Sequence, residues 1–286
     1  MLSPDAFFGS PYLATAIAAL FGLLVGSFLN VVIYRLPVMV ERQWRRDSRE
    51  FLELPEEPHE PFNLATPASR CNVCGVHIRA WQNIPVVSFL IQGAKCAACK
   101  TPLSWQYPLV ELLTAVLSGA VVWQYGDTLL AYAGLPFTWL LIAMAIIDLR
   151  TTYLHDVLTL PFLWLGLLAS ALSLTVVPSD AIWGAILGYG SLWLVFQLFK
   201  LVTGKEGMGY GDFKLLAGLG AWLGWYQLPI VILLSSVSGA VVGGLWLALS
   251  SRGRETQIPF GPWLAMAGWL TFMWGDSVSR MLFGQF

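Results

Sequence analysis

Charged residues are scarce in this 286-residue chain, where Lys, Arg, Asp and Glu together make up 12%. Soluble domains carry about 25%, so the deficit excludes an ordinary soluble protein, in agreement with the mean hydropathy of +0.66. The alternation of apolar and polar residues that marks the strands of a membrane barrel is also missing. Long runs are instead continuously apolar, which indicates membrane helices. With a net charge of −1, we expect no nucleic-acid partner.

Two further signals are absent. No segment combines a basic start, a short apolar run and a small-residue cleavage site, so the first apolar run is expected to stay in the protein. No Gly-x-Gly-x-x-Gly motif follows a strand pattern, and a Rossmann-type cofactor site therefore cannot be read from the sequence.

Eight apolar runs dominate the chain. They lie at residues 11–34, 109–125, 129–147, 157–176, 181–201, 214–226, 228–250 and 260–283. A helix needs roughly 20 residues to cross the hydrocarbon core, and only the second and sixth runs are clearly short. The predicted fold class is an all-α polytopic membrane protein with about eight transmembrane helices and one small soluble domain.

The soluble domain is predicted over residues 35–108. This stretch contains all four cysteines together with nine Lys and Arg, seven Asp and Glu and eight prolines. The first helix is expected to end at Arg35 and Pro37, and residues 41–60 are expected to form an exposed, partly disordered arm. The predicted parts are an N-terminal transmembrane helix over 1–34, the cysteine domain over 35–108 and a seven-helix membrane core over 109–286.

The four cysteines form two Cys-x-x-Cys pairs, Cys71 with Cys74 and Cys96 with Cys99. Four thiolates at such spacing form a closed tetrahedral zinc site, which is structural rather than catalytic, although the gap between the pairs is slightly longer than usual. Free or redox-active thiols are the alternative interpretation. His77 is read as a bystander, because four cysteines already complete a site.

The positive charges predict the orientation of the helices. When the eight predicted helices alternate across the bilayer, all but one of the 16 Lys and Arg fall on the same side, Arg280 being the exception. Positive residues collect on the cytoplasmic side. The domain over 35–108 is therefore predicted to be cytoplasmic, and Asp148 and Asp212 are predicted to lie at the cytoplasmic membrane edge.

These two aspartates are the candidate catalytic residues. Asp212 follows three glycines in the segment 207–211, between two apolar runs, and Asp148 ends the apolar run 139–147. An ionisable residue at the membrane is a functional-site hypothesis by default, and two carboxylates at one face match an aspartyl-protease pair. The alternatives are a solvated acid in a flexible turn and a helix-ending charge that pairs with Arg150.

Other polar positions have simpler interpretations. Asp156 precedes a helix and is expected to act as its N-cap. Glu111 lies at the start of a predicted helix, where an acid stabilises the first turn, and a role in a site on the cytoplasmic side is left open. The prolines of the segment 259–262 are read as ordinary helix starters.

Taken together, these segments resemble the type IV prepilin peptidases. The resemblance is carried by residues 26–37, both Cys-x-x-Cys pairs, and residues 83–90, 107–114, 148–156, 207–214 and 258–262. It covers nearly the whole chain, and its motifs occur in the family's order. One departure is His155, where Pro commonly precedes the second Asp of the 148–156 segment, and this weakens any role for Asp156.

The resemblance implies a bacterial inner-membrane aspartyl protease with Asp148 and Asp212 as its catalytic acids. It further implies that prepilins and pseudopilins are the substrates, and that their short basic leader is removed at the cytoplasmic face of the bilayer. Members with the cysteine domain also methylate the new N-terminal amine with S-adenosylmethionine. The residues that bind this cofactor are left open.

Two functions of other classes compete with this interpretation. Paired aspartates also form proton or cation paths in helical membrane transporters, although transporters usually place them near the middle of the membrane. A membrane scaffold that docks partners through its zinc domain is the third possibility. Shortening of a prepilin by the purified protein would separate the protease from both.

Overall fold

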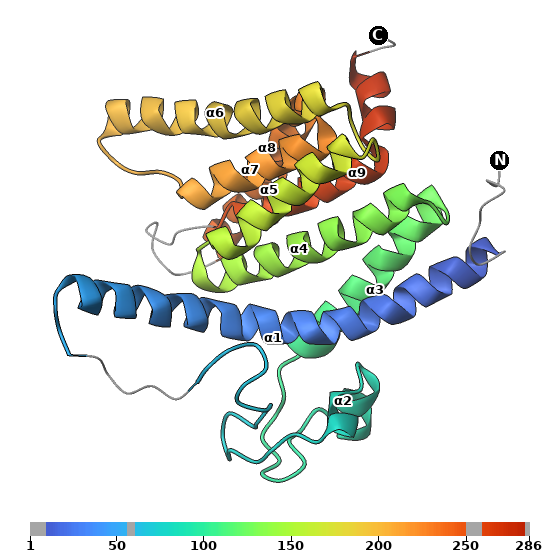
Figure 1. The fold of residues 1–286 in the computed structure, drawn as a ribbon, viewed down its shortest axis with the longest axis vertical. Coiled ribbons are helices and arrows are strands. Elements are labelled where there is room, and N and C mark those ends of the chain that lie inside the picture. The colour runs from blue at the N-terminus through green and yellow to red at the C-terminus, as the bar shows by residue number, and fades with distance from the viewer. Residues whose placement is uncertain (1–9, 56–60, 250–258, 284–286) are drawn as a thin grey trace. The chain divides into compact units, whose positions relative to one another are not determined.

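The computed structural model describes residues 10–55, 61–249 and 259–283, and within these ranges its regular elements are helices. The chain divides into two compact units, a first unit over Met1–Thr128 and a second unit over Leu129–Phe286 (Figure 1). All eight predicted apolar runs coincide with a helix. The all-helical prediction is therefore confirmed for the described part of the chain.

The first unit is built on two long helices, α1 (Pro11–Phe51) and α3 (Gln106–Tyr125). Their contact is close because α1 has glycine where it meets α3. A Cβ at Gly22 would lie 2.8 Å from the carbonyl oxygen of Thr114, and one at Gly26 would lie 2.7 Å from the Cα of Glu111. Small residues allow membrane helices to approach in this way.

The predicted end of the first helix is wrong. Helix α1 continues through Pro37 to Phe51, so residues 41–51 of the expected disordered arm are helical. Proline in a helix interior costs about 3 kcal/mol, and the next turns offset part of this with side-chain pairs four residues apart. Arg45 contacts Glu41 at 2.6 Å, and Gln43 contacts Asp47 at 2.7 Å. Residues 56–60 of the arm lie outside the described residues.

Where the structure describes the stretch between α1 and α3, its helices are short, the 3-10 helix η1 (Ala80–Asn83) and α2 (Val87–Ile91). Arg35 of α1 is buried and donates hydrogen bonds to the carbonyl oxygens of Asn63 and Pro67, at 2.9 and 2.7 Å. This stretch is therefore fastened to α1 at the point where the apolar part of that helix ends.

The described part of the second unit contains six longer helices. They are α4 (Leu129–Thr151), α5 (Asp156–Ala171), α6 (Pro178–Thr203), α7 (Tyr210–Leu223), α8 (Leu228–Leu249) and α9 (Gly261–Phe283), with the short 3-10 helix η2 (Trp225–Gln227) before α8. Helix α7 packs against α5, α6 and α9 and is buried along most of its length. Its position is fixed where Gly184 of α6 crosses Gly220 of α7, since a Cβ on either residue would collide with the other backbone.

Among the described residues, five helical segments are long and apolar enough to cross a membrane. They belong to α1, α3, α4, α6 and the segment Trp225–Leu245, and α5 is a shorter apolar helix. The chain is accordingly a multi-pass membrane protein. Helix α7 has 14 residues and spans about 21 Å at 1.5 Å per residue, which is less than the roughly 30 Å of a hydrocarbon core.

Candidate active site and cysteine cluster

The structure places both candidate acids in the second unit, at the ends of helices. Asp148 lies in the last turn of α4 and is 4% exposed, and Asp212 lies in the first turn of α7 and is 8% exposed. The two side chains are near enough for the charge of Asp148 to act on Asp212. Burial of two acids that repel each other is costly for a folded protein, which points to a chemical use rather than to a solvated turn.

Asp148 is held by a backbone group from the start of α9. The N–H of Gly261 donates to Oδ2 of Asp148 at 3.0 Å. A Cβ at this position would lie 2.7 Å from that same oxygen, so any other residue would displace the carboxylate of Asp148. The segment 259–262 therefore contacts a candidate catalytic group as well as starting a helix. Sequence reasoning missed this contact, and only the family resemblance had drawn attention to the segment.

Leu154 packs against Gly211, the residue before Asp212, and against Gly261, which bonds Asp148. A Cβ at Gly211 would lie 2.6 Å from the Cβ of Leu154, and a Cβ at Gly261 would lie 3.1 Å from its Cδ1. Leu154 is 7% exposed and lies in the connection between α4 and α5. The connection after Asp148 thus packs against the residue before Asp212, which couples the positions of the two acids.

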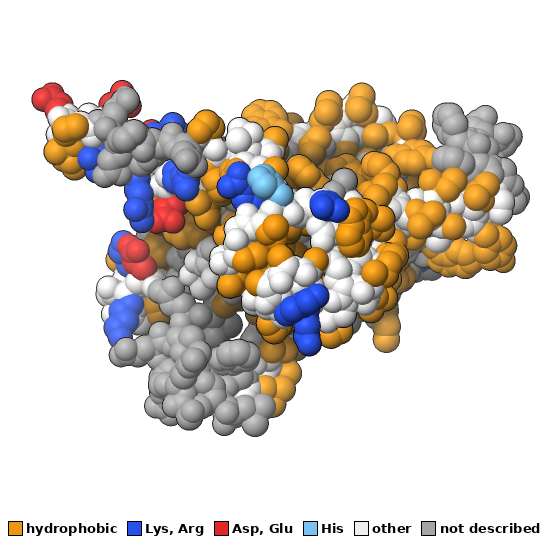
Figure 2. Space-filling model, turned by 90° about the horizontal axis from the view of Figure 1, so that it is seen from below, with side chains coloured by type: hydrophobic (Ala, Val, Ile, Leu, Met, Phe, Trp, Pro, Cys, Tyr) orange, Lys and Arg blue, Asp and Glu red, His pale blue; other side chains and the backbone are white. Residues whose placement is uncertain are grey.

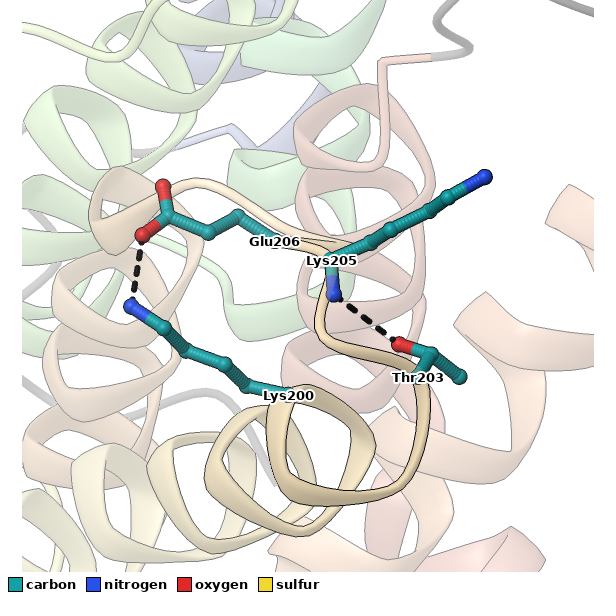
Figure 3. Close-up of polar contacts among 4 residues, drawn as sticks. All are labelled: Lys200, Thr203, Lys205 and Glu206. Carbon is teal, nitrogen blue, oxygen red and sulfur yellow. Dashed lines mark hydrogen bonds and ion pairs between the residues drawn. The ribbon is translucent and has the colours of Figure 1, made fainter.

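The glycine-rich turn before Asp212 is fastened to α6. Gly204 ends that helix with a φ of 69°, a left-handed conformation that glycine adopts without strain. Lys200 of α6 contacts Glu206 at 2.7 Å, and the N–H of Lys205 donates to Oγ1 of Thr203 at 3.2 Å, while the Lys205 side chain points away from both (Figure 3). These two contacts join the start of the turn to the last residues of α6.

Asp156 does not act as an N-cap, contrary to expectation. The cap position belongs to His155, and Asp156 is the first residue of α5. Its carboxylate instead forms an ion pair with Lys214 of α7, with Nζ at 2.6 and 2.8 Å from the two oxygens. Burial lowers the pKa of His155 despite the neighbouring charge of Asp156, which favours the neutral imidazole. The ion pair between Asp156 and Lys214 links the start of α5 to α7, the helix that carries Asp212.

Glu111 belongs to the first unit and does not stabilise a first turn, because the first turn of α3 contains no acid. It is buried on α3, where its Oε2 accepts the backbone N–H of Val86 at 2.8 Å and its carboxylate also bonds the side chain of Ser27. Val86 has a φ of 59°. Glu111 therefore holds the residue that precedes α2 in an unusual backbone conformation.

The four cysteine sulfurs lie within 4.8 Å of one another, as a shared metal ion requires. Cys71 is 3.8 Å from Cys99, and Cys74 is 4.0 Å from Cys96. Tetrahedral zinc with bonds of about 2.3 Å holds its sulfurs about 3.8 Å apart, so the cluster fits zinc. His77 is not part of it, as expected.

Two similar turns build this cluster. The N–H of Cys71 donates to Val76 at 2.9 Å, and the N–H of Cys96 donates to Thr101 at the same distance. Gly75 has a φ of 70° in the first turn, a left-handed conformation that glycine adopts without strain. The Thr101 hydroxyl lowers the pKa of Cys99 to about 6.

Two family models match the chain. The bacterial peptidase A24 N-terminal domain matches residues 20–125, and the type IV leader peptidase family matches residues 135–244. The first match contains the cysteine cluster and Glu111, and the second contains Asp148 and Asp212. No solved structure matches the chain.

Curated relatives are similar over nearly the whole chain. A prepilin leader peptidase/N-methyltransferase from Stutzerimonas stutzeri is 55% identical over 97% of this chain and 97% of its own length. Proteins of the same name from Pseudomonas aeruginosa and Neisseria gonorrhoeae are 56% and 50% identical, and the matches cover 91% and 95% of this chain and 90% and 94% of theirs. The chain therefore belongs to the type IV leader peptidase family.

Proposed function

We propose that this chain is a membrane aspartyl endopeptidase that removes the leader peptide of type IV prepilins and pseudopilins and then methylates the new N-terminus. The observation that carries the proteolytic part is the pair of buried acids, Asp148 and Asp212, held at helix ends in one unit. The relatives' shared name, prepilin leader peptidase/N-methyltransferase, supports both activities. It does not favour the transporter alternative.

The two acids are proposed to act as a coupled pair. Neighbouring carboxyl groups in a poorly solvated site share one proton, since two adjacent negative charges are costly. The ionised group takes a proton from the attacking water, and the protonated group donates a hydrogen bond to the scissile carbonyl. The N–H of Gly261 fixes one oxygen of Asp148 and so orients that group toward the reaction.

Room for the substrate backbone is available beside Asp212. A Cβ placed on Gly209 would meet no atom nearer than Oδ2 of Asp212, at 3.9 Å. The backbone at Gly209 is thus open next to a catalytic oxygen. An extended peptide could lie along this glycine, which suits cleavage of a short leader from an apolar segment.

The placement in the membrane is part of the proposal. We infer eight crossings in the bacterial inner membrane, with the acids at the cytoplasmic face, from the alternation of basic residues along the sequence. Arg252 and Arg254, which contribute to that argument, lie outside the described residues. The shortness of α7 would place Asp212 below the membrane surface, within reach of a substrate helix.

The cysteine cluster is proposed to hold a structural zinc ion. Cys71, Cys74, Cys96 and Cys99 would supply all four ligands and leave no open position for a substrate. S-adenosylmethionine would supply the methyl group. Methylation must follow cleavage, because the amine that accepts the methyl group is released only when the peptide bond is cut.

One experiment tests both activities. The purified full-length protein is incubated with a prepilin and S-adenosylmethionine, and mass spectrometry of the pilin N-terminus reads cleavage and methylation together. We expect loss of the leader followed by a gain of one methyl group. A prepilin that stays intact would refute the protease and favour a transporter or a scaffold.

A further inference from the structure

Helix α2 exposes apolar side chains on one face although it belongs to the soluble part of the first unit. Val87, Leu90 and Ile91 are 50%, 67% and 72% exposed, whereas Ser88 and Phe89 are buried. The exposed residues are spaced three and four positions apart and share one side of the helix. Contiguous apolar surface of this kind marks a contact site.

The position of α2 relative to a membrane is determined by its contact with α3. Glu111 of α3 accepts the N–H of Val86, the residue directly before α2. Glu111 lies five residues after Gln106, where α3 begins, which is about 7.5 Å along the helix. The interfacial layer on each side of a bilayer is roughly 5–8 Å thick. A membrane-spanning α3 therefore places α2 beside the headgroup layer.

The surroundings of α2 also suit a lipid surface. Trp105, 65% exposed at the start of α3, packs edge-to-face on Phe89 with ring centroids 5.0 Å apart, and tryptophan is enriched at membrane interfaces. Leu109, Leu112 and Leu113 on α3 are also exposed. These side chains would contact lipid if α3 spans the membrane, so α2 belongs to the same unit as a helix with an apolar exposed surface.

The charge of this region is complementary to anionic lipid. Residues 61–108 contain no Asp or Glu, and their basic residues, Arg70, Arg79, Lys95 and Lys100, are all exposed. Figure 2 shows Lys and Arg side chains next to apolar and uncharged ones on the face seen from below. Basic residues near a membrane surface are attracted to anionic headgroups.

We propose that α2 is an interfacial helix whose apolar face, Val87, Leu90 and Ile91, dips into the headgroup layer of an anionic bilayer and seats the cysteine domain on the membrane. The occupant is lipid rather than a second copy of the chain or a pilin. This goes beyond the proposed enzymatic function and would hold if either activity were absent. It would also keep the domain close to a pilin N-terminus that emerges at the membrane.

The wild-type protein provides the first test, so no variant has to fold. It is reconstituted in nanodiscs that contain a phospholipid with a diazirine on its acyl chain near the headgroup, irradiated and mapped by mass spectrometry. We expect adducts on Leu90 and Ile91 at a level similar to that on Leu109. Phe51 is the control, since it is 88% exposed but lies about 24 Å farther along α1 than Arg35. Labelling of α2 no stronger than that of Phe51 would overturn the proposal.

A variant pair tests the same face by another measurement. Hydrogen exchange of the α2 amides is compared in nanodiscs of neutral lipid and of neutral lipid with a third of phosphatidylglycerol. Protection should be stronger with the anionic lipid, and Leu90→Ser/Ile91→Ser should lower it by about tenfold. Leu52→Ser/Leu54→Ser, which also changes two exposed apolar residues, should leave it unchanged. Equal protection in both lipids, or cross-linking of α2 to protein rather than lipid, would contradict a lipid contact.

Discussion

The two units position the residues of their candidate sites by different kinds of contact. In the second unit, both acids are less than 10% exposed and lie on helices whose packing determines where the carboxyl groups meet. In the first unit, the cysteines lie on turns between helices, and Cys74 and Cys99 are exposed. The acids are positioned by contacts distant in sequence, whereas the cysteines are positioned by local turns and by the metal they would share. A substitution that disrupts one of these sites should therefore leave the other site intact.

The largest effect is expected from removing either acid. Asp148→Asn and Asp212→Asn should each lower leader cleavage by at least about 10²–10⁴-fold, the usual contribution of a positioned acid or base. Both variants should insert and accumulate normally, because asparagine has the same shape and no charge to bury. The cleavage rate of a purified prepilin is the measurement.

Methylation by the Asp variants provides a second measurement. A double Asp variant should fail to methylate an intact prepilin, yet should still methylate a pilin supplied already cut. Asp180→Asn serves as the control for the cleavage rates, because Asp180 is a half-buried acid in the first turn of α6, where it accepts a hydrogen bond from Trp225 rather than contacting the candidate acids. Near wild-type cleavage by either single variant would remove that residue from the catalytic pair.

The next effect concerns the cysteine cluster. Cys74→Ser and Cys96→Ser should each lose the zinc, about one ion per chain, and should destabilise the cysteine domain by several kcal/mol, because metal binding contributes to folding. Methylation should fall more than cleavage, since the acids lie in the other unit. Metal analysis and mass spectrometry of the pilin N-terminus are the measurements.

Two outcomes would change this interpretation. A protein purified under reducing conditions without chelator that contains no zinc would refute the metal site. If the serine variants lose cleavage and methylation in strict parallel, the domain is a support shared by both activities. The site of methyl transfer would then have to be sought among the membrane helices.

Local sequence patterns predicted what depends on local chemistry. Continuous apolar runs predicted the positions of the helices, because a helix depends on neighbouring residues. The two Cys-x-x-Cys pairs predicted the cluster although they are distant in sequence, because four thiols in such pairs suit one metal ion. The end of α1 was predicted wrongly, since Pro37 usually ends a helix but the following turns stabilise themselves with side-chain pairs. The family resemblance is confirmed by the two matching models.

Contacts between distant segments could not be predicted in the same way. Gly261 and Asp148 are 113 residues apart, and Lys214 and Asp156 are 58 apart. No periodicity connects such residues, because their contact results from the packing of α4, α5, α7 and α9. The catalytic role of Asp148 and Asp212 itself remains a prediction.

A smaller effect should come from the packing that couples the acids. Gly211→Ala adds a Cβ that would lie 2.6 Å from the Cβ of Leu154. Overpacking of this kind costs about 1–3 kcal/mol, and the displacement falls on the residue next to Asp212. Cleavage should decrease about tenfold. Gly190→Ala is the matched control, because no atom lies within 4 Å of a Cβ at that helical position, and its rate should not change.

The smallest effect is expected from the ion pair between Asp156 and Lys214. The two side chains are 53% and 29% exposed, and partly exposed pairs contribute about 0.2–1 kcal/mol. Asp156→Asn or Lys214→Met should therefore lower cleavage by less than about fivefold, through a looser contact between α5 and α7. If the attraction between the two charges is what matters, the double variant Asp156→Lys/Lys214→Asp, which exchanges them, should be more active than Asp156→Lys alone. This recovery should be larger in low salt than in high salt. A loss on Asp156→Asn as large as that on Asp148→Asn would instead make Asp156 a candidate for the catalytic pair.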